Sequence, residues 1–275
     1  MTGAAHSPSL LFAEVLLIWH ATNYLVSADP TRSGHRNSFS RATAKRLGWF
    51  LFRATGAASM TMAVAGRWPG LLLAGTMFIG CIILPAARWL WVPTRYIPEL
   101  ELAGNIGFAA SAQFLIAHFD MQVRWGLFRL PASEGLISAY TVAAALMIFV
   151  VRGGTLIVRG VLDRAGTMPP PEVAQPHSLA ANSALDLQRA LPVDAIDLNH
   201  GRLIGNIERL ILVLFVANGQ YTALAFFFAA KGLIRSKDVE RRAWADYLIL
   251  GSLTSFLVAV VAGLLIQTVF NAATP

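Results

Sequence analysis

The stretch from Leu210 to Ala230 reads LILVLFVANGQYTALAFFFAA, and its 21 residues include no charge. An α-helix needs about 20 predominantly apolar residues to cross the hydrocarbon core of a bilayer. This stretch meets that length without help from its neighbours. It therefore predicts a transmembrane helix, and the rest of the chain contains further stretches of the same kind.

The overall composition agrees with a membrane protein. Of the 275 residues, 56% are hydrophobic and 13% are charged, and the mean hydropathy is +0.57. Because soluble domains carry about 25% charged residues, this composition excludes a water-soluble globular protein. The net charge of +7 comes mostly from Lys and Arg beside apolar runs, which is typical of topology signals and not of nucleic-acid binding.

Apolar runs predict an all-α polytopic bundle with about seven spans, which together form one membrane domain. The expected spans are 10–26, 47–65, 70–87, 100–119, 136–151, 210–230 and 247–270.

Three parts of this domain are expected from the sequence. Residues 1–162 hold the N-terminal membrane helices, with about five spans. Residues 163–200 form a Pro-rich loop, because the run Met168–Pro176 excludes regular structure. Residues 201–275 form a C-terminal two-helix membrane unit.

The orientation stays open in this assignment. The 27–46 loop and the 231–246 loop are both basic, as cytoplasmic loops are. Five crossings between them would place them on opposite faces. Either the short fifth span is re-entrant, or one basic loop lies on the outer face.

Charged residues inside a span cost about 2.5–3.5 kcal/mol each on insertion scales, so they mark candidate sites. Arg53 and Glu14 cannot escape to an interface, whereas Glu101, Glu208 and Arg209 lie at span edges and are expected there. At 1.5 Å per residue, six polar residues fall one or two turns from the same face. These candidate pocket residues are His20, Arg53, Asn105, Glu208, Arg209 and Gln267.

The alternative to a ligand pocket is that each of these residues only caps, snorkels or bonds a neighbouring helix. A second group of basic residues follows the sixth span and is a candidate contact for anionic lipid. It comprises Lys231, Arg235, Arg241 and Arg242, and the alternative is simple anchoring.

The sequence contains no recognisable cofactor or catalytic motif. Cys81 is the only cysteine, so neither an intramolecular disulfide nor a thiolate cluster can form. His20 and His118 fall at opposite depths and cannot ligate one haem. No zinc, nucleophile-elbow or Walker motif occurs. We expect no cofactor and no bound metal, and the sequence gives no positive evidence for catalysis.

Residues 201–262 resemble the C-terminal part of an uncharacterised family of bacterial integral membrane proteins. The resemblance rests on Gly201–Arg209, Gly219-Gln220, Ala229–Arg235 and Asp246–Ser255. It implies importance for Glu208, Arg209, Gln220, Lys231, Arg235 and Tyr247.

Members of this family look to have a His followed four residues later by Asp in the first span. Here His20 is followed by Tyr24, and the fourth span offers Asn105 in place of a His ligand. The chain therefore departs from the family pattern that would suggest a metal site.

The sequence thus predicts a multi-pass protein of the bacterial cytoplasmic membrane. The first functional hypothesis is binding or transport of a lipid or small anionic compound through a polar intramembrane pocket. The second is an interaction or scaffold subunit, and the third is a degenerate intramembrane metal hydrolase. Expected partners are membrane lipids and either another membrane protein or a second copy of the chain, but no nucleic acid.

Overall fold

The computed structural model describes residues 8–25, 41–66, 68–88, 92–123, 127, 133–167, 195–235 and 242–274, and within these it leaves out the side chains of 41–47, 195–202, 234–235 and 242–245. The Pro-rich run and Arg241 lie outside the described residues. The same holds for the side chains of Arg235 and Arg242.

The described part of the chain is all-helical and contains no β-strand, as the sequence predicts. A π-helical turn, η1 (Ala21–Leu25), continues α1, and a 3-10 turn, η4 (Thr94–Tyr96), leads into α4. The α-helices are α1 (Pro8–His20), α2 (Arg41–Ala65), α3 (Trp68–Ala86), α4 (Ile97–His118), α5 (Glu134–Arg164), α7 (Ala195–Ala217), α8 (Tyr221–Arg235) and α9 (Arg242–Ala273).

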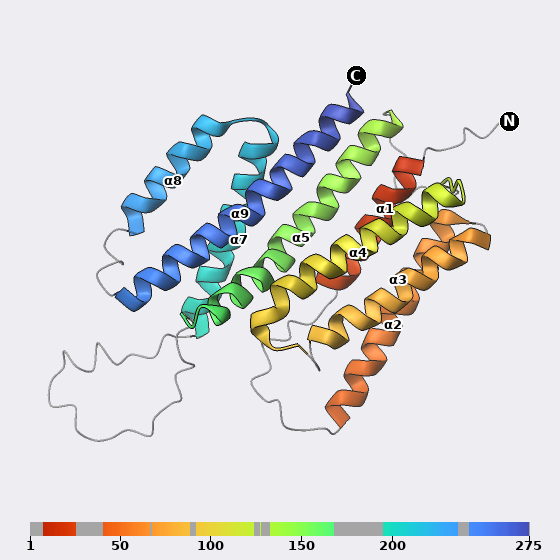
Figure 1. Cartoon of the computed structure of the whole chain (residues 1–275), viewed down its shortest axis with the longest axis horizontal. Coiled ribbons are helices and arrows are strands. Elements are labelled where there is room, and N and C mark those ends of the chain that lie inside the picture. The colour runs from red at the N-terminus through yellow and green to blue at the C-terminus, as the bar shows by residue number, and fades with distance from the viewer. Residues whose placement is uncertain are drawn as a thin grey trace.

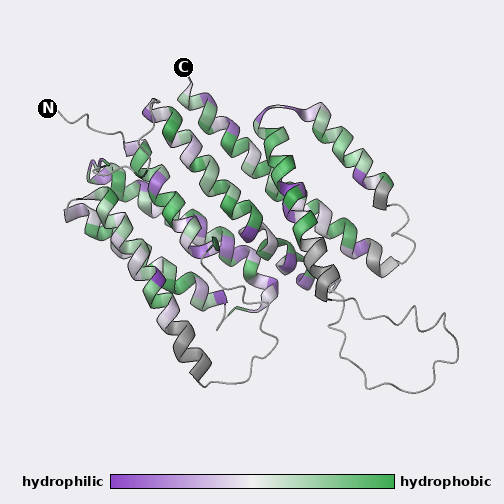
Figure 2. Ribbon diagram, turned by 180° about the vertical axis from the view of Figure 1, so that it is seen from behind, coloured by the Kyte–Doolittle hydropathy of each residue, from purple (hydrophilic) through white to green (hydrophobic). Residues whose placement is uncertain are grey.

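Successive helices lie roughly side by side and alternate in direction (Figure 1). The long helix α5 is central, because it packs against α1 and α4 on one side and against α9 and α7 on the other. Helix α8 packs mainly on α7 at the edge. Hydrophobic residues predominate along the helices, with hydrophilic positions interspersed among them (Figure 2).

Four helices in the described part are long and apolar enough to cross a membrane: Trp68–Ala86, Thr94–His118, Glu134–Arg164 and Asp246–Ala273. They make the chain compatible with an integral membrane protein. The expected count of about seven spans is not confirmed.

The fifth span was expected to be short, but α5 is 31 residues long. It continues through Arg152 and Arg159 because its buried face does not stop there. Leu156, Ile157 and Gly160 are still buried, so packing on this face outweighs the interspersed charges.

The sixth span, expected as one helix over 210–230, is wrong. Helix α7 ends at Ala217, and Gly219 adopts a positive φ of 67° before α8 begins. The Gln220 N–H donates to the Phe215 carbonyl at 2.8 Å and the Gly219 N–H to the Val216 carbonyl at 3.0 Å. This pattern of two bonds closes a helix C-terminus when glycine takes the left-handed position. The last unit therefore has three helices where two were expected.

The two largest apolar clusters hold most of the bundle together. One cluster is formed mainly by the four helices α1, α2, α3 and α4 and includes Trp19, Met77 and Ile116. The other joins α5, α7 and α9 around Val213 and Ala259. Helix α5 touches both clusters, so polar groups on its two sides belong to different surroundings.

Candidate functional site

The end of the first helix is the centre of the candidate site. The π-helical turn Ala21–Leu25 ends this helix, and π-turns are rare and frequent at functional sites. The last carbonyl groups of a helix lack partners within it and carry the negative end of the helix dipole. Such carbonyls attract cationic donors.

Two arginines from other helices donate to these carbonyls. Arg53 of α2 donates through Nη2 to the carbonyl oxygen of Thr22. Arg88, just beyond α3, donates through Nη1 to the carbonyl oxygen of Asn23 at 3.4 Å. The turn is therefore held between α2 and the end of α3.

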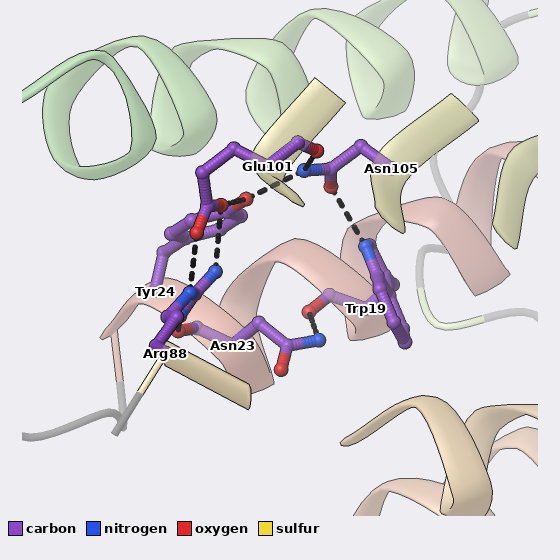
Figure 3. Close-up of polar contacts among 6 residues, drawn as sticks. All are labelled: Trp19, Asn23, Tyr24, Arg88, Glu101 and Asn105. Atoms are coloured by element: carbon purple, nitrogen blue, oxygen red, sulfur yellow. Dashed lines mark hydrogen bonds and ion pairs between the residues drawn. The ribbon is translucent and has the colours of Figure 1, made fainter. Parts of the chain in front are cut away.

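Arg88 forms a fully buried ion pair with Glu101 of α4 (Figure 3). Its Nε donates to Oε1, and its Nη2 donates to Oε2 at 2.7 Å. The Tyr24 hydroxyl donates to the same Oε2 at 2.5 Å, and the Arg88 guanidinium lies 5.1 Å from the centre of the Tyr24 ring. Both charges of this pair are thus neutralised by partners within the bundle.

Asn105 extends this network towards α1. Its Nδ2 donates to the Tyr24 hydroxyl at 2.6 Å, and its Oδ1 accepts from the Trp19 indole at 2.8 Å (Figure 3). The Trp19 ring stacks on Phe108 with a centroid distance of 4.0 Å. One face of α4 therefore fixes the last turns of α1.

Arg53 is different, because it is buried at 4% exposure without an anionic partner. Its Nε and Nη1 have no hydrogen-bond acceptor, and no Asp or Glu of the described residues contacts it. It lies close enough to Cys81 and Arg88 to interact electrostatically with both. Within the described part of the chain, one buried cation in this region is thus left without a counter-ion.

Asn23 adds an unmet acceptor beside the same turn. Its Nδ2 donates to the Trp19 carbonyl at 3.1 Å and lies 3.7 Å from the Cys81 sulfur. Its Oδ1 has no donor within the described part of the chain. Within the described residues, the region around the turn therefore offers two donor nitrogens and one oxygen acceptor without partners.

His20 lies next to this network and is 3% exposed. Its Nδ1 is 2.9 Å from the Leu16 carbonyl of its own helix. Its ring stacks with Tyr24 at 5.8 Å and meets the edge of Phe149 at 5.8 Å. These contacts make His20 a packing residue of α1.

Arg209 lies on the other side of α5. It is 4% exposed, and its Nη2 donates to Thr155 Oγ1 at 2.7 Å and to Asn206 Oδ1, while its Nη1 donates to Ser255 Oγ at 3.3 Å. Its acceptors are neutral oxygens from α5, α7 and α9. Its Nε has no acceptor and faces Gly154, where a methyl group would lie 3.5 Å away.

The last two expected pocket residues have partners of their own. Glu208 pairs with Lys231 of α8. The Gln267 Oε1 accepts from the Tyr221 hydroxyl at 3.4 Å. The six residues therefore separate into a group at the first turn, with His20, Arg53 and Asn105, and three residues around α7.

The expectation that Glu101 and Arg209 would reach the interface is wrong. Glu101 is 0% exposed and Arg209 is 4% exposed, because each finds polar partners inside the bundle. Sequence reasoning also missed Arg88, Asn23 and Tyr24 as members of the network. The sequence signal for this network was the spacing of Glu101 and Asn105, which are four residues apart and therefore lie on the same face of one helix.

No group of three His, Cys, Asp or Glu residues that could hold a metal ion occurs within the described ranges. Comparison with known proteins found no matching family model, no matching curated protein and no matching solved structure. The resemblance of residues 201–262 to a bacterial membrane family stays an interpretation of the sequence.

Proposed function

We propose that this chain is a multi-pass protein of the bacterial cytoplasmic membrane that binds an oxyanion at Arg53. The ligand is a phosphate group, carried either by a lipid headgroup or by a small soluble molecule. The observation that carries this proposal is the buried guanidinium of Arg53, two of whose nitrogens, Nε and Nη1, have no acceptor among the described residues.

The charge balance around the turn supports an anionic ligand. Arg53 and Arg88 bring two positive charges, and Glu101 supplies one negative charge that Arg88 already engages. An uncompensated buried charge costs several kcal/mol. A phosphate oxygen would supply both the missing charge and the missing acceptors.

The free Asn23 Oδ1 narrows the ligand further. A ligand that engaged this oxygen as well as Arg53 would have to donate a hydrogen bond in addition to accepting one. Hydrogen phosphate has both an O⁻ and an O–H group, and so does a phosphodiester lipid with a hydroxylated headgroup. A plain inorganic halide would leave the Asn23 oxygen unmet.

The basic residues after α8 add a second lipid contact to this proposal. Lys231 is engaged with Glu208, so the contact would depend on Arg235, Arg241 and Arg242. In the sequence, these residues extend from the last residue of the outer helix α8 to the first residue of α9. Anionic headgroups at this connection would hold the C-terminal end of α8 at the membrane surface.

The test is ligand-induced thermal stabilisation of the purified protein. Probes are inorganic phosphate, vesicles of phosphatidylglycerol and vesicles of phosphatidylcholine. A ligand present at 100 times its Kd stabilises by about 2.7 kcal/mol, which raises the melting temperature. Arg53→Gln should abolish this rise, whereas Arg164→Gln, which removes an exposed positive charge, should keep it.

Each result has a defined meaning. Stabilisation by phosphate identifies a soluble oxyanion, and stabilisation only by phosphatidylglycerol identifies a lipid headgroup. If Arg53→Gln does not fold, Arg53→Lys keeps the charge but loses donors, and should weaken binding about tenfold or more. No stabilisation by either anionic probe, or full stabilisation of the Arg53 variants, overturns the proposal.

A further inference from the structure

The direction of the helices brings the ends of four helices and the beginnings of four others to one end of the bundle (Figure 1). Helices α1, α3, α5 and α8 end there, and α2, α4, α7 and α9 begin there. The connections are 26–40, 87–96, 165–194 and 236–241, and we call this end the basic end. The connections at the opposite end are 66–67, 119–133 and 218–220.

The break at Gly219 is what makes this arrangement possible. Because α7 and α8 are separate antiparallel helices, one more reversal occurs before α9. The helices that flank the two basic loops therefore enter and leave them at the same end of the bundle. A single uninterrupted helix over 210–230 would have separated them.

The Lys and Arg residues are distributed unequally between the two ends. Of the 22 in the chain, only Arg67, Arg124 and Arg129 belong to connections of the opposite end. Another three, Arg53, Arg152 and Arg209, lie within helices away from both ends. All the others belong to connections of the basic end or to helical positions within about two turns of it.

We infer that the basic end faces the cytoplasm and lies against the anionic headgroups of the cytoplasmic leaflet. An excess of Lys and Arg in short connections marks the cytoplasmic side of membrane proteins. Anionic lipids of that leaflet attract such residues by about 1 kcal/mol each near the surface.

This orientation also places the Arg53 site, a step that rests on the proposed function. Arg53 donates to Thr22, which lies three residues before the last residue of the π-turn at the basic end. The neighbouring Arg88 directly follows α3 at that end. The oxyanion at Arg53 would therefore lie at the level where α1 ends, on the basic-end side of the bundle and twelve residues into α2.

Single-cysteine accessibility tests the orientation without any ligand. Cys81 is the only cysteine and is fully buried, so the unsubstituted chain is the unlabelled background. Exposed positions for new cysteines are Ala165 at the basic end, and Gln122 and Gln220 at the opposite end. Spheroplasts are treated with a membrane-impermeant maleimide before and after permeabilisation.

Gln122→Cys and Gln220→Cys should be labelled in intact spheroplasts, and Ala165→Cys only after permeabilisation. The reverse pattern, or labelling of all three in intact spheroplasts, overturns the inference. Protection of Gln220→Cys alone would show that the chain does not reverse at Gly219, which also overturns it. Expected labelling together with absent phosphate binding would refute only the proposed function.

Discussion

Arg53 and Arg88 contact the same π-turn, but the residues around them give them different roles. Arg88 has Glu101 and the Tyr24 ring as partners, so its charge is neutralised within the bundle. Among the described residues, Arg53 donates to the Thr22 carbonyl and lies over the face of Phe50, whose centre is 5.9 Å away, but it contacts no carboxylate. Arg88 therefore stabilises the fold, whereas Arg53 has N–H groups available to bind a ligand.

Glu101→Gln tests the structural role of the buried pair. The change leaves the Arg88 charge buried without a counter-ion, so the free energy of unfolding should fall by about 3–5 kcal/mol. Glu99→Gln is the matched control, because Glu99 lies two residues away and pairs with Arg164 in an exposed position. Unfolding in detergent mixtures measures both variants, and equal losses would contradict a special role for burial.

At the scale of the helices, close approach depends on glycines that face a neighbouring backbone. A methyl group on Gly263 of α9 would lie 2.6 Å from Val216 Cβ and 3.1 Å from the Val213 carbonyl oxygen of α7. Gly205 of α7, by contrast, has open space around it. A methyl group at Gly205 would therefore meet no neighbouring helix.

Gly263→Ala should separate α7 from α9. Because Val216 Cβ cannot rotate away, the cost should be about 1–3 kcal/mol in the free energy of unfolding. Gly205→Ala adds the same methyl group to a helix without a clash and should cost nothing. A loss of stability in the Gly205 variant as large as in the Gly263 variant would show that the contact at Gly263 is not the cause.

The ion pair between Lys231 and Glu208 connects α8 to α7. A double-mutant cycle with Lys231→Met and Glu208→Gln should give a coupling energy of about 1 kcal/mol, since the pair is only partly shielded. Each single variant should also be cleaved faster by protease near α8, because this outer helix loses its ion pair to α7. Additive effects in the cycle would mean that the two side chains do not act as a pair.

At the scale of the whole molecule, α5 separates two polar regions. Gly153 faces Tyr24 and Phe149, while Gly154 faces Arg209 and Val258. These consecutive glycines let helices approach from both sides at one level of α5. The two buried arginines, Arg53 and Arg209, therefore belong to separate halves of the bundle.

Cys81 reports whether the N-terminal half unfolds as a unit. Its side chain is fully buried among α1, α3 and the Asn23 amide. The thiol should stay unreactive towards maleimide until denaturant unfolds the helices, whereas a cysteine at the exposed Ala165 should react at once. Labelling of native Cys81 before any loss of helical circular dichroism would contradict a tightly packed half.

The amino-acid sequence by itself determined that this chain is helical and apolar enough for a membrane, because hydrophobicity and length are local properties. It also identified Arg53 as a candidate site residue, because this arginine lies too far inside its apolar run for its charge to reach the membrane interface. What only the tertiary structure decided is which polar groups meet. Arg53 and Arg209 were expected to lie at a similar depth in the membrane and to share a pocket. They do not meet, because α5 lies between the polar region of Arg53 and that of Arg209.

The same limit explains the number of chain reversals. Whether Gly219 interrupts a helix depends on whether α8 has a surface to pack against, and the surface it finds is formed by α7 and α9. Glu101 and Arg209 seemed free to reach water because a sequence shows the distance to a helix end but not the partners inside. Pairing across helices is a property of their packing, and packing is set by all the helices at once.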